Sequence, residues 1–341
     1  MIQFPSNLDS ALAALKDGAH GVAQPRAGGT DLQHRRALGL TSGPVVDLTR
    51  LPELGAIEIT PEGARIGAMV TVAQLAADPA IRRGYPGLAA AAHDLATPQI
   101  RAVATVGGNL LQRNRCWYYR SPQYTCLKKG GATCFAREGD HVFHACFDLG
   151  PCVAAHPSTV GLAMLAYDAQ IEIAGGQRRA IAELYGDGSN VRGDNTLEAG
   201  AVLTAALLPP PTPGEQSAYL RVSSRALAEW PLVDVVVRLV VSGGVITTAA
   251  VTLGGVANVP LRHRAVERAL LGQAPGAATW EAAAVAAREG ATPLAGTRYK
   301  VDLLGPAVQD AIERALRQAP LNLPPPPVPD LSPPQPPTKG G

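Results

Sequence analysis

Hydrophobic and polar positions alternate along the chain with two periods, one helical and one of two residues. Leu8, Leu12 and Leu15 lie at helical spacing, and Gly18 follows as a stop signal. The segments expected to be helical are 8–15, 70–77, 87–95, 162–165, 265–271 and 308–319. The segments expected to be strands are 45–48, 57–59, 64–68, 169–173, 233–241 and 245–253. This mixture of separate helical and strand segments predicts an α+β fold.

Proline divides the chain. The run Leu208–Gly214 contains four prolines and predicts a stiff connection between a domain of residues 1–211 and a second domain of residues 215–318. From Pro320 onwards the tail, 320–341, is mostly proline and is expected to form an extended arm.

The composition excludes several classes of protein. A chain of 341 residues suits two or three compact units, and its net charge of +2 is spread along the sequence, which counts against a nucleic-acid or membrane-surface partner. No apolar run is long enough for a membrane span. The start of the chain lacks an export signal of its own, so we expect a cytoplasmic protein, or a periplasmic one exported together with a partner subunit.

Two glycine-rich stretches are candidate anion sites. Paired glycines at 28–29 and at 107–108 let backbone N–H groups approach a pyrophosphate closely. Neither stretch has the spacing of a Walker loop or of a Rossmann fingerprint. Taken alone, the first of them favours a plain tight turn.

Five cysteines lie within one short segment, 116–152. Four thiolates can hold a [4Fe–4S] cluster, whereas structural zinc usually takes close Cys-x-x-Cys pairs, which this chain lacks. Buried reduced cysteines suit this polar, irregular segment poorly, and disulfides would leave one thiol over. From the residues alone, a cluster, zinc and disulfides all stay open.

Several motifs together resemble a known family. They are residues 27–32 (AGGTDL), 66–68 with Thr71, 104–109 (ATVGGN), 221–225 (RVSSR) and 253–262 (LGGVANVPLR). In this order they resemble the FAD subunits of the xanthine dehydrogenase and aldehyde oxidoreductase family, the molybdenum hydroxylases, over roughly residues 1–318. The resemblance implies a two-part FAD-binding domain of the vanillyl-alcohol-oxidase (PCMH) type, with parts of about 1–55 and 56–211. A small α+β domain of the CO dehydrogenase flavoprotein type would follow.

The resemblance also implies where FAD would bind. Residues 26–32 would hold its pyrophosphate and residues 105–109 would lie beside the flavin. Asp168 would approach the adenosine end and Arg225 the flavin. The implied FAD residues are Arg26, Ala27, Gly28, Gly29, Thr30, Asp31, Leu32, Thr71, Thr105, Gly107, Gly108, Asn109, Asp168 and Arg225. Many relatives carry Asp at the position of Thr159, so no role is expected for that residue.

A minority of the family, resembling bacterial periplasmic aldehyde oxidoreductases and 4-hydroxybenzoyl-CoA reductase, carries a [4Fe–4S] cluster in an insert at this place. The resemblance implies an iron–sulfur insert at 113–152 with the ligands Cys116, Cys126, Cys134 and Cys152. Cys146 lies in an apolar alternation and is expected to be a spectator. A role beside the cluster or at the surface is expected for His141, His144 and His156.

The implied function is electron transfer. Such a subunit would accept electrons from a 2Fe–2S small subunit, beside a large subunit that binds the molybdenum cofactor, and pass them from FAD to an external acceptor. The alternatives are a subunit like that of 4-hydroxybenzoyl-CoA reductase, a stand-alone flavin oxidase, and, from a different class, a zinc-stabilised scaffold subunit. The sequence suggests no acid–base residue.

Overall fold

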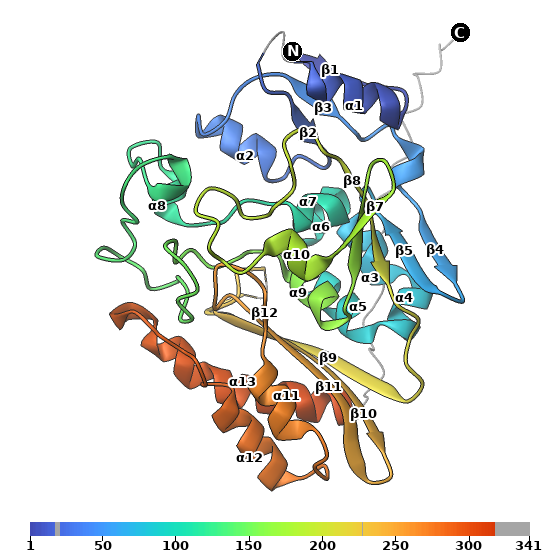
Figure 1. The fold of residues 1–341 in the computed structure, drawn as a ribbon, viewed down its shortest axis with the longest axis vertical. Helices are drawn as coiled ribbons and strands as arrows, with labels where there is room; N and C mark the ends of the chain where they lie inside the picture. The colour runs from blue at the N-terminus through green and yellow to red at the C-terminus, as the bar shows by residue number, and fades with distance from the viewer. Residues whose placement is uncertain (18–20, 227, 318–341) are drawn as a thin grey trace, which may run out of the picture.

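The computed structural model describes residues 1–17, 21–226 and 228–317. Its N-terminal unit is a small parallel sheet in the order β1-β3-β2, with two helices (Figure 1). The elements are β1 (Ile2–Gln3), α1 (Leu8–Lys16), β2 (Gln24–Arg26), α2 (Leu32–Ala37) and β3 (Val45–Asp47). The predicted first helix and strand are confirmed. Asn7 begins α1 because its side chain accepts a hydrogen bond from the Ser10 N–H.

A five-stranded antiparallel sheet in the order β4-β5-β8-β6-β7 forms the centre of the molecule. Its strands are β4 (Ile57–Thr60), β5 (Gly63–Gly67), β6 (Gln170–Ile173), β7 (Gln177–Ala180) and β8 (Leu203–Leu208). The predicted hairpin is therefore confirmed as β4–β5. Since β8 comes from far along the chain and lies between β5 and β6, the sheet joins the segments before and after the cysteine-rich insert.

Seven helices lie in the same part of the described chain, and most of them share one buried apolar core with this sheet. They are α3 (Val72–Ala77), α4 (Pro79–Gly84), α5 (Pro86–His93), α6 (Pro98–Val103), α7 (Val106–Leu110), α9 (Thr159–Ala166) and α10 (Ile181–Tyr185). Helices α5 and α9 also contact strands of the C-terminal sheet. Helix α9 is buried along its whole length, which explains its uniformly apolar sequence. Proline at the first position begins α4, α5 and α6, where a missing N–H costs nothing. The glycine-rich stretch 105–109 is mostly the short helix α7 with Thr105 as its N-cap.

The cysteine-rich insert is irregular, with α8 (Trp117–Arg120) and the 3-10 turn Leu127–Lys129 as its regular parts. It lies at the left of Figure 1 and reaches the start of the last helix. Tyr299 donates a hydrogen bond of 2.9 Å to the Val142 carbonyl, and Lys300 Nζ donates one of 3.2 Å to the Phe143 carbonyl. The insert is thus fixed to the C-terminal part of the chain.

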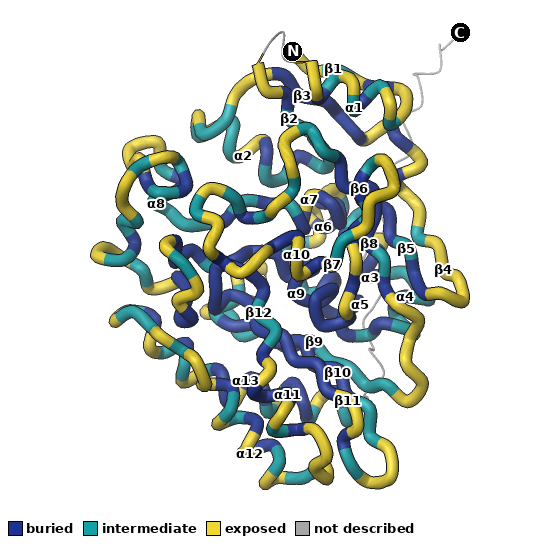
Figure 2. Tube along the Cα trace, viewed as in Figure 1, coloured by how far each residue is buried: buried dark blue, intermediate teal, exposed yellow. Residues whose placement is uncertain are grey.

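The C-terminal unit packs a four-stranded antiparallel sheet, in the order β12-β11-β10-β9, against three helices. The strands are β9 (Glu215–Val222), β10 (Val233–Ser242), β11 (Val245–Gly254) and β12 (Leu261–Arg262). The helices are α11 (Arg264–Leu270), α12 (Ala277–Ala286) and α13 (Arg298–Arg317). Figure 2 shows the inner strands buried and the outer side of α12 exposed. The chain passes from β8, which ends at Leu208, to β9, which begins at Glu215, through the proline run.

The last helix starts well before its predicted position, whereas the other predicted helices are shifted at their ends by one to three residues. Helix α13 begins at Arg298, ten residues before the predicted start, and it runs through Pro306. Gly305 lies so close to the Ala284 carbonyl of α12 that packing keeps the helix together at two residues that usually end one.

The α+β fold with two successive domains is confirmed. The proline-rich tail lies outside the described residues, and no helix within them is long and apolar enough to cross a membrane.

Candidate flavin and thiol sites

The two glycine stretches lie on one cavity of about 240 Å³, which we call the glycine-loop cavity. It lies between the loop that joins β2 to α2 and the N-terminal end of α7. Nine predicted residues line it: Ala27, Gly28, Gly29, Thr30, Asp31, Leu32, Thr105, Gly107 and Gly108. The fold therefore brings together two motifs that are about 75 residues apart in the sequence.

Close packing requires glycine at two positions on these walls. A Cβ atom at Gly28 would lie 1.7 Å from the Val103 carbonyl oxygen, and one at Gly107 would lie 2.8 Å from the Ala68 Cβ. These glycines let the loop rest directly on the backbone at the end of α6, and let α7 rest on the residue after β5. The glycines thus bring the two backbones together around the cavity.

Three predicted residues support this cavity from behind. Arg26 forms an ion pair with buried Asp47, and Thr71 caps α3 and forms an isolated β-bridge with Thr105. Asn109 points away from the cavity, where its Oδ1 accepts a hydrogen bond of 2.8 Å from the Ser158 hydroxyl. The side chains of these three residues hold the backbone of the cavity walls in position.

Asp168 and Arg225 lie elsewhere. Asp168 has a left-handed backbone (φ 52°) and pairs with Arg262 at 2.8 Å, away from the walls of the glycine-loop cavity. Arg225 lines a separate cavity of about 470 Å³, which we call the aromatic cavity because Trp117, Phe143 and Trp230 lie on its walls.

The charge around the glycine-loop cavity is positive despite Asp31. Asp31 Oδ1 accepts hydrogen bonds from Arg115 at 2.8 Å and Arg120 at 2.7 Å, and Arg35 lies 3.7 Å from Oδ2. Burial opposes ionisation of Asp31, but Arg115 and Arg120 outweigh it and lower the pKa of the carboxyl. Three arginines around one carboxylate leave a net positive rim, which suits an anionic ligand.

Arg115 connects the two cavities. It holds Asp31 and, at 3.0 Å, the Gln112 Oε1 atom, both on the glycine-loop cavity, while its guanidinium lies 4.8 Å from the ring centroid of Trp230 on the aromatic cavity. Burial lowers the pKa of Arg115 to about 10, so it stays charged at neutral pH. A ligand long enough to leave the glycine-loop cavity would meet this side chain.

Four of the five cysteines line one small cavity, the thiol cavity. They are Cys116, Cys126, Cys134 and Cys152. Its free volume is about 10 Å³, so a bound cluster would have to push the thiols apart from these positions. Tyr118 and Tyr119 are among the other residues that line it. No three His, Cys, Asp or Glu side chains of the described chain are grouped closely enough to hold a single metal ion.

The thiols differ in their acidity. Cys134 and Cys152 share a hydrogen bond that lowers the pKa of Cys134 to about 6 and raises that of Cys152. Burial raises the pKa of Cys116 to about 11. A bound cluster would need its ligands as thiolates, and its metal ions would supply the charge that ionises them.

The fifth cysteine and the three histidines in and just after the insert have different surroundings. Cys146 is fully buried in the apolar core of the C-terminal unit, away from the thiol cavity, because its backbone pairs with Val256. His141 instead joins the insert to Gly296, whose N–H donates a hydrogen bond of 3.0 Å to its Nε2. His144 and His156 both line the aromatic cavity, and burial lowers the pKa of each to about 4, so both are neutral at physiological pH.

A buried ion network holds the insert to the body of the protein. Asp194 forms ion pairs with Lys128 at 2.9 Å and with Arg113 at 2.7 Å. Lys128 also lines the thiol cavity, directly after Cys126 and Leu127. The position of Cys126 therefore depends on the carboxylate of Asp194, which lies in a loop that is distant in sequence.

Family comparisons agree with this geometry. Residues 2–211 match the family described as the FAD binding domain in molybdopterin dehydrogenase, and residues 218–317 match the CO dehydrogenase flavoprotein C-terminal domain. The first match alone covers more than half of the chain. The chain belongs to the FAD-binding subunits of the molybdenum hydroxylase family.

Individual relatives of this FAD-binding subunit support the same family. It is 36% identical over 253 residues, 72% of this chain and 78% of the relative, to the aldehyde oxidoreductase FAD-binding subunit PaoB of Escherichia coli K12. It is 27% identical over 325 residues, 92% of this chain and 96% of the relative, to the carbon monoxide dehydrogenase medium chain of Afipia carboxidovorans. A solved structure of reconstituted CO dehydrogenase from Oligotropha carboxidovorans has the same fold, with a TM-score of 0.73 at 23% identity over 93% of this chain and 98% of that one. The family resemblance inferred from the motifs is confirmed.

Several residues of the FAD-binding subunit's cavities were not singled out from the sequence. Arg35, Gln112, Arg115 and Trp230 all line a cavity. The segment Arg113–Arg115 did offer a signal, since it places two arginines between a glycine motif and the first cysteine. Arg35 and Trp230 gave none, because their positions depend on distant packing.

Proposed function

We propose that this chain is the FAD- and [4Fe–4S]-containing electron-transfer subunit of a molybdenum-dependent, aldehyde oxidoreductase-like complex. It would accept electrons from a 2Fe–2S small subunit beside a molybdenum-cofactor-binding large subunit and pass them from FAD to an external acceptor. The observation that carries the cluster is the gathering of four thiols, and not the fifth, on one cavity. Family membership supports the flavin and counts against a zinc-stabilised scaffold.

The glycine-loop cavity would hold the diphosphate of FAD. Gly28 and Gly107 keep the two backbones that form its walls close together, and Arg35 and Arg115 would supply positive charge. At about 240 Å³ this cavity is smaller than the range of roughly 300–1,000 Å³ for sites that enclose a whole ligand. The rest of the cofactor would extend past Arg115, and Arg225 on the aromatic cavity would lie toward its ring end.

The thiol cavity would hold the cluster through Cys116, Cys126, Cys134 and Cys152. Thiolate sulfur is the ligand that iron–sulfur clusters use, so the donor set fits. Tyr118 and Tyr119 would shield it from water, and Lys128 would place a positive charge beside the anionic thiolates.

Bound FAD supplies the exchange of two electrons with partners that take one or two at a time. The residues of this chain bind and orient it: Arg35 and Arg115 neutralise the diphosphate, and Asp31 keeps Arg115 and Arg120 in place. The imidazole of His156, which lines the aromatic cavity, is neutral at physiological pH. The organic substrate would be chosen by the large subunit. The proposal suits the cytoplasm, or the periplasm after export together with a partner subunit.

The test compares two cysteine variants of the purified complex. Wild type is expected to contain FAD, iron and sulfide, with flavin absorption bands and a broad shoulder. Cys152→Ser is expected to lose the shoulder and the iron, while Cys146→Ser keeps both, since Cys146 lies in the apolar core. The opposite result would overturn the ligand assignment, and a colourless, zinc-containing protein would overturn the proposed function.

A further inference from the structure

One predicted cluster ligand, Cys116, faces two cavities. Among the four cysteines of the thiol cavity, Cys116 is the one that also lines the aromatic cavity. It follows Arg115 and precedes Trp117, which both lie on the aromatic cavity. Any side chain that touches Cys116 from that direction therefore sits between the two predicted redox sites.

His144 is that side chain. Its Nε2 atom lies 3.2 Å from the Cys116 Sγ atom, and the residue is only 3% exposed. Its ring packs edge-on against Trp117, with centroids 5.2 Å apart, and its backbone N–H donates to the His141 carbonyl at 2.9 Å. The imidazole is thus held in one orientation toward the sulfur.

A packing role alone does not account for a histidine here. Its Nδ1 atom is buried without a hydrogen-bond partner among the described residues. Leaving a buried polar atom unpaired costs about 1–3 kcal/mol, and a phenylalanine would fill the same space beside Trp117 and Phe143 without that cost. The contact that distinguishes histidine from phenylalanine is the one with Cys116.

The direction of this hydrogen bond follows from the chemistry of the sulfur. A cysteine that ligates iron is a thiolate and has no proton to donate. Nε2 must then carry the proton and donate, which leaves the unpartnered Nδ1 as the bare nitrogen. The geometry accordingly selects one tautomer of His144.

We propose that His144 is a positioning residue that raises the reduction potential of the cluster by donating an N–H···S hydrogen bond to Cys116. This inference rests on the cluster of the proposed function. Reduction adds negative charge to the cluster and its sulfurs, so a donor aimed at one of them stabilises the reduced state more than the oxidised one.

The experiment measures the cluster potential in the intact complex by a redox titration followed by electron paramagnetic resonance. His144→Phe keeps the packing and removes the donor. It is expected to shift the equilibrium toward the oxidised cluster by about tenfold, about 59 mV more negative for a one-electron couple. His144→Gln keeps an N–H donor and is expected to recover part of the shift.

A matched control is His263→Phe. His263 is also buried, packs on an aromatic ring (Phe147, 5.7 Å) and has an unpartnered Nδ1, but unlike His144 it does not line the aromatic cavity beside Cys116. It is expected to leave the potential unchanged. Should His144→Phe lose its cluster, His144→Met against His144→Gln makes the same comparison, with the Gln variant expected at the higher potential.

The outcomes separate the two hypotheses. Equal potentials for wild type, the donor-free variants and His144→Gln would overturn the role of His144 while leaving the cluster in place. A wild-type complex without iron and sulfide would overturn the proposed function itself.

Discussion

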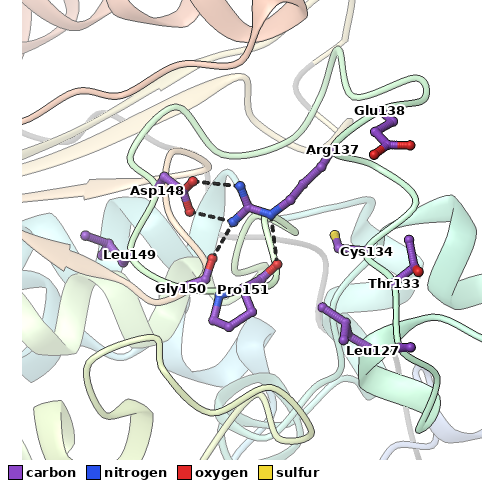
Figure 3. Close-up of a pocket in the computed structure, with 10 residues that line it drawn as sticks. Leu127, Thr133, Cys134, Arg137, Glu138, Asp148, Leu149, Gly150 and Pro151 are labelled. Atoms are coloured by element: carbon purple, nitrogen blue, oxygen red, sulfur yellow. Dashed lines mark hydrogen bonds and ion pairs between the residues drawn. The ribbon is translucent and has the colours of Figure 1, made fainter.

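Arg137 holds Asp148 through two parallel hydrogen bonds, Nη1 to Oδ2 and Nη2 to Oδ1, each 2.8 Å long. The same guanidinium donates to the carbonyls of Gly150 at 2.7 Å and Pro151 at 3.1 Å (Figure 3). Arg137 belongs to the turn that follows Cys134, and its hydrogen bonds connect this turn to the one that leads directly into Cys152. The residues joined by these hydrogen bonds line a surface hollow, together with Cys134.

We expect Arg137→Ala to loosen the cluster more than the fold. The ion pair is about one-third exposed on each side, so its loss is expected to cost less than about 1 kcal/mol of global stability. Iron should nevertheless be lost several times faster to an added chelator, followed as decay of visible absorption. Arg314→Ala, which breaks a similar two-bond pair with Asp310 on α13, is the control and should release iron at the wild-type rate. Equal rates of iron release for both variants would show that the bonds made by Arg137 do not hold the cluster ligands in place.

Gly28→Ala is expected to abolish tight FAD binding. The new Cβ would lie 1.7 Å from the Val103 carbonyl oxygen, so the loop must move away from the neighbouring backbone and the cavity must change shape. Flavin content after gel filtration measures this. Gly276→Ala is the matched control, because it adds the same methyl group at an extended position with no atom within 4 Å. Full flavin content in the Gly28 variant would rule out the diphosphate site.

Arg115→Met is expected to weaken FAD binding on the order of 10- to 100-fold. The change removes one charge-assisted contact of about 1.5–3 kcal/mol while keeping a long apolar stem against Trp230. Equilibrium binding of FAD to the deflavinated protein gives the number, and the affinity of wild type should depend more on salt than that of the variant. Arg268→Met, which breaks an exposed pair with Glu289, should bind FAD normally.

Asp194→Asn is expected to reduce stability at neutral pH by about 3–5 kcal/mol, since it leaves Lys128 and Arg113 without their buried partner. Burial opposes the charge of Asp194, but Arg113 and Lys128 outweigh it and hold its pKa below the ordinary 3.8. A carboxyl group whose pKa is lower in the folded than in the unfolded state stabilises the fold at pH values above its unfolded-state pKa. This contribution is lost as the pH falls through its folded-state pKa. The stability difference between wild type and variant should therefore narrow below about pH 4.

Thermal midpoints measured across a pH series test this expectation. Asp310→Asn serves as the control, because it removes a surface pair and should change stability by less than about 1 kcal/mol at any pH. A gap between wild type and Asp194→Asn that stays constant with pH would show that the carboxylate charge does not matter.

The periodic segments of the fold could be predicted from the sequence because their period directly reflects burial of one face. The β4–β5 and β10–β11 hairpins and the first helix are examples. Helix α13 could not be, because local rules end a helix at Gly305 and Pro306, while contact with α12 holds it together. Tertiary packing overrides local propensity there.

The site was predictable as a set of backbone motifs and less so as a set of side chains. The glycine stretches do line one cavity, and glycine is needed there because two backbones meet closely. The direction of Asn109, toward Ser158 and away from the cavity, and the surface position of Asp168 depend on partners far along the chain. A motif fixes where a residue is, whereas its surroundings decide where its side chain points.

The contacts that tie the insert to Asp194 and Lys300 limit how it can be transplanted. Residues 113–152 have little regular structure and draw their shape from a loop on one side and from the first turn of α13 on the other. A graft of this segment alone onto another protein of the same fold would arrive without either anchor. An engineered electron-transfer protein that borrows the four cysteines must therefore also import a carboxylate at the position of Asp194 and a lysine at the position of Lys300.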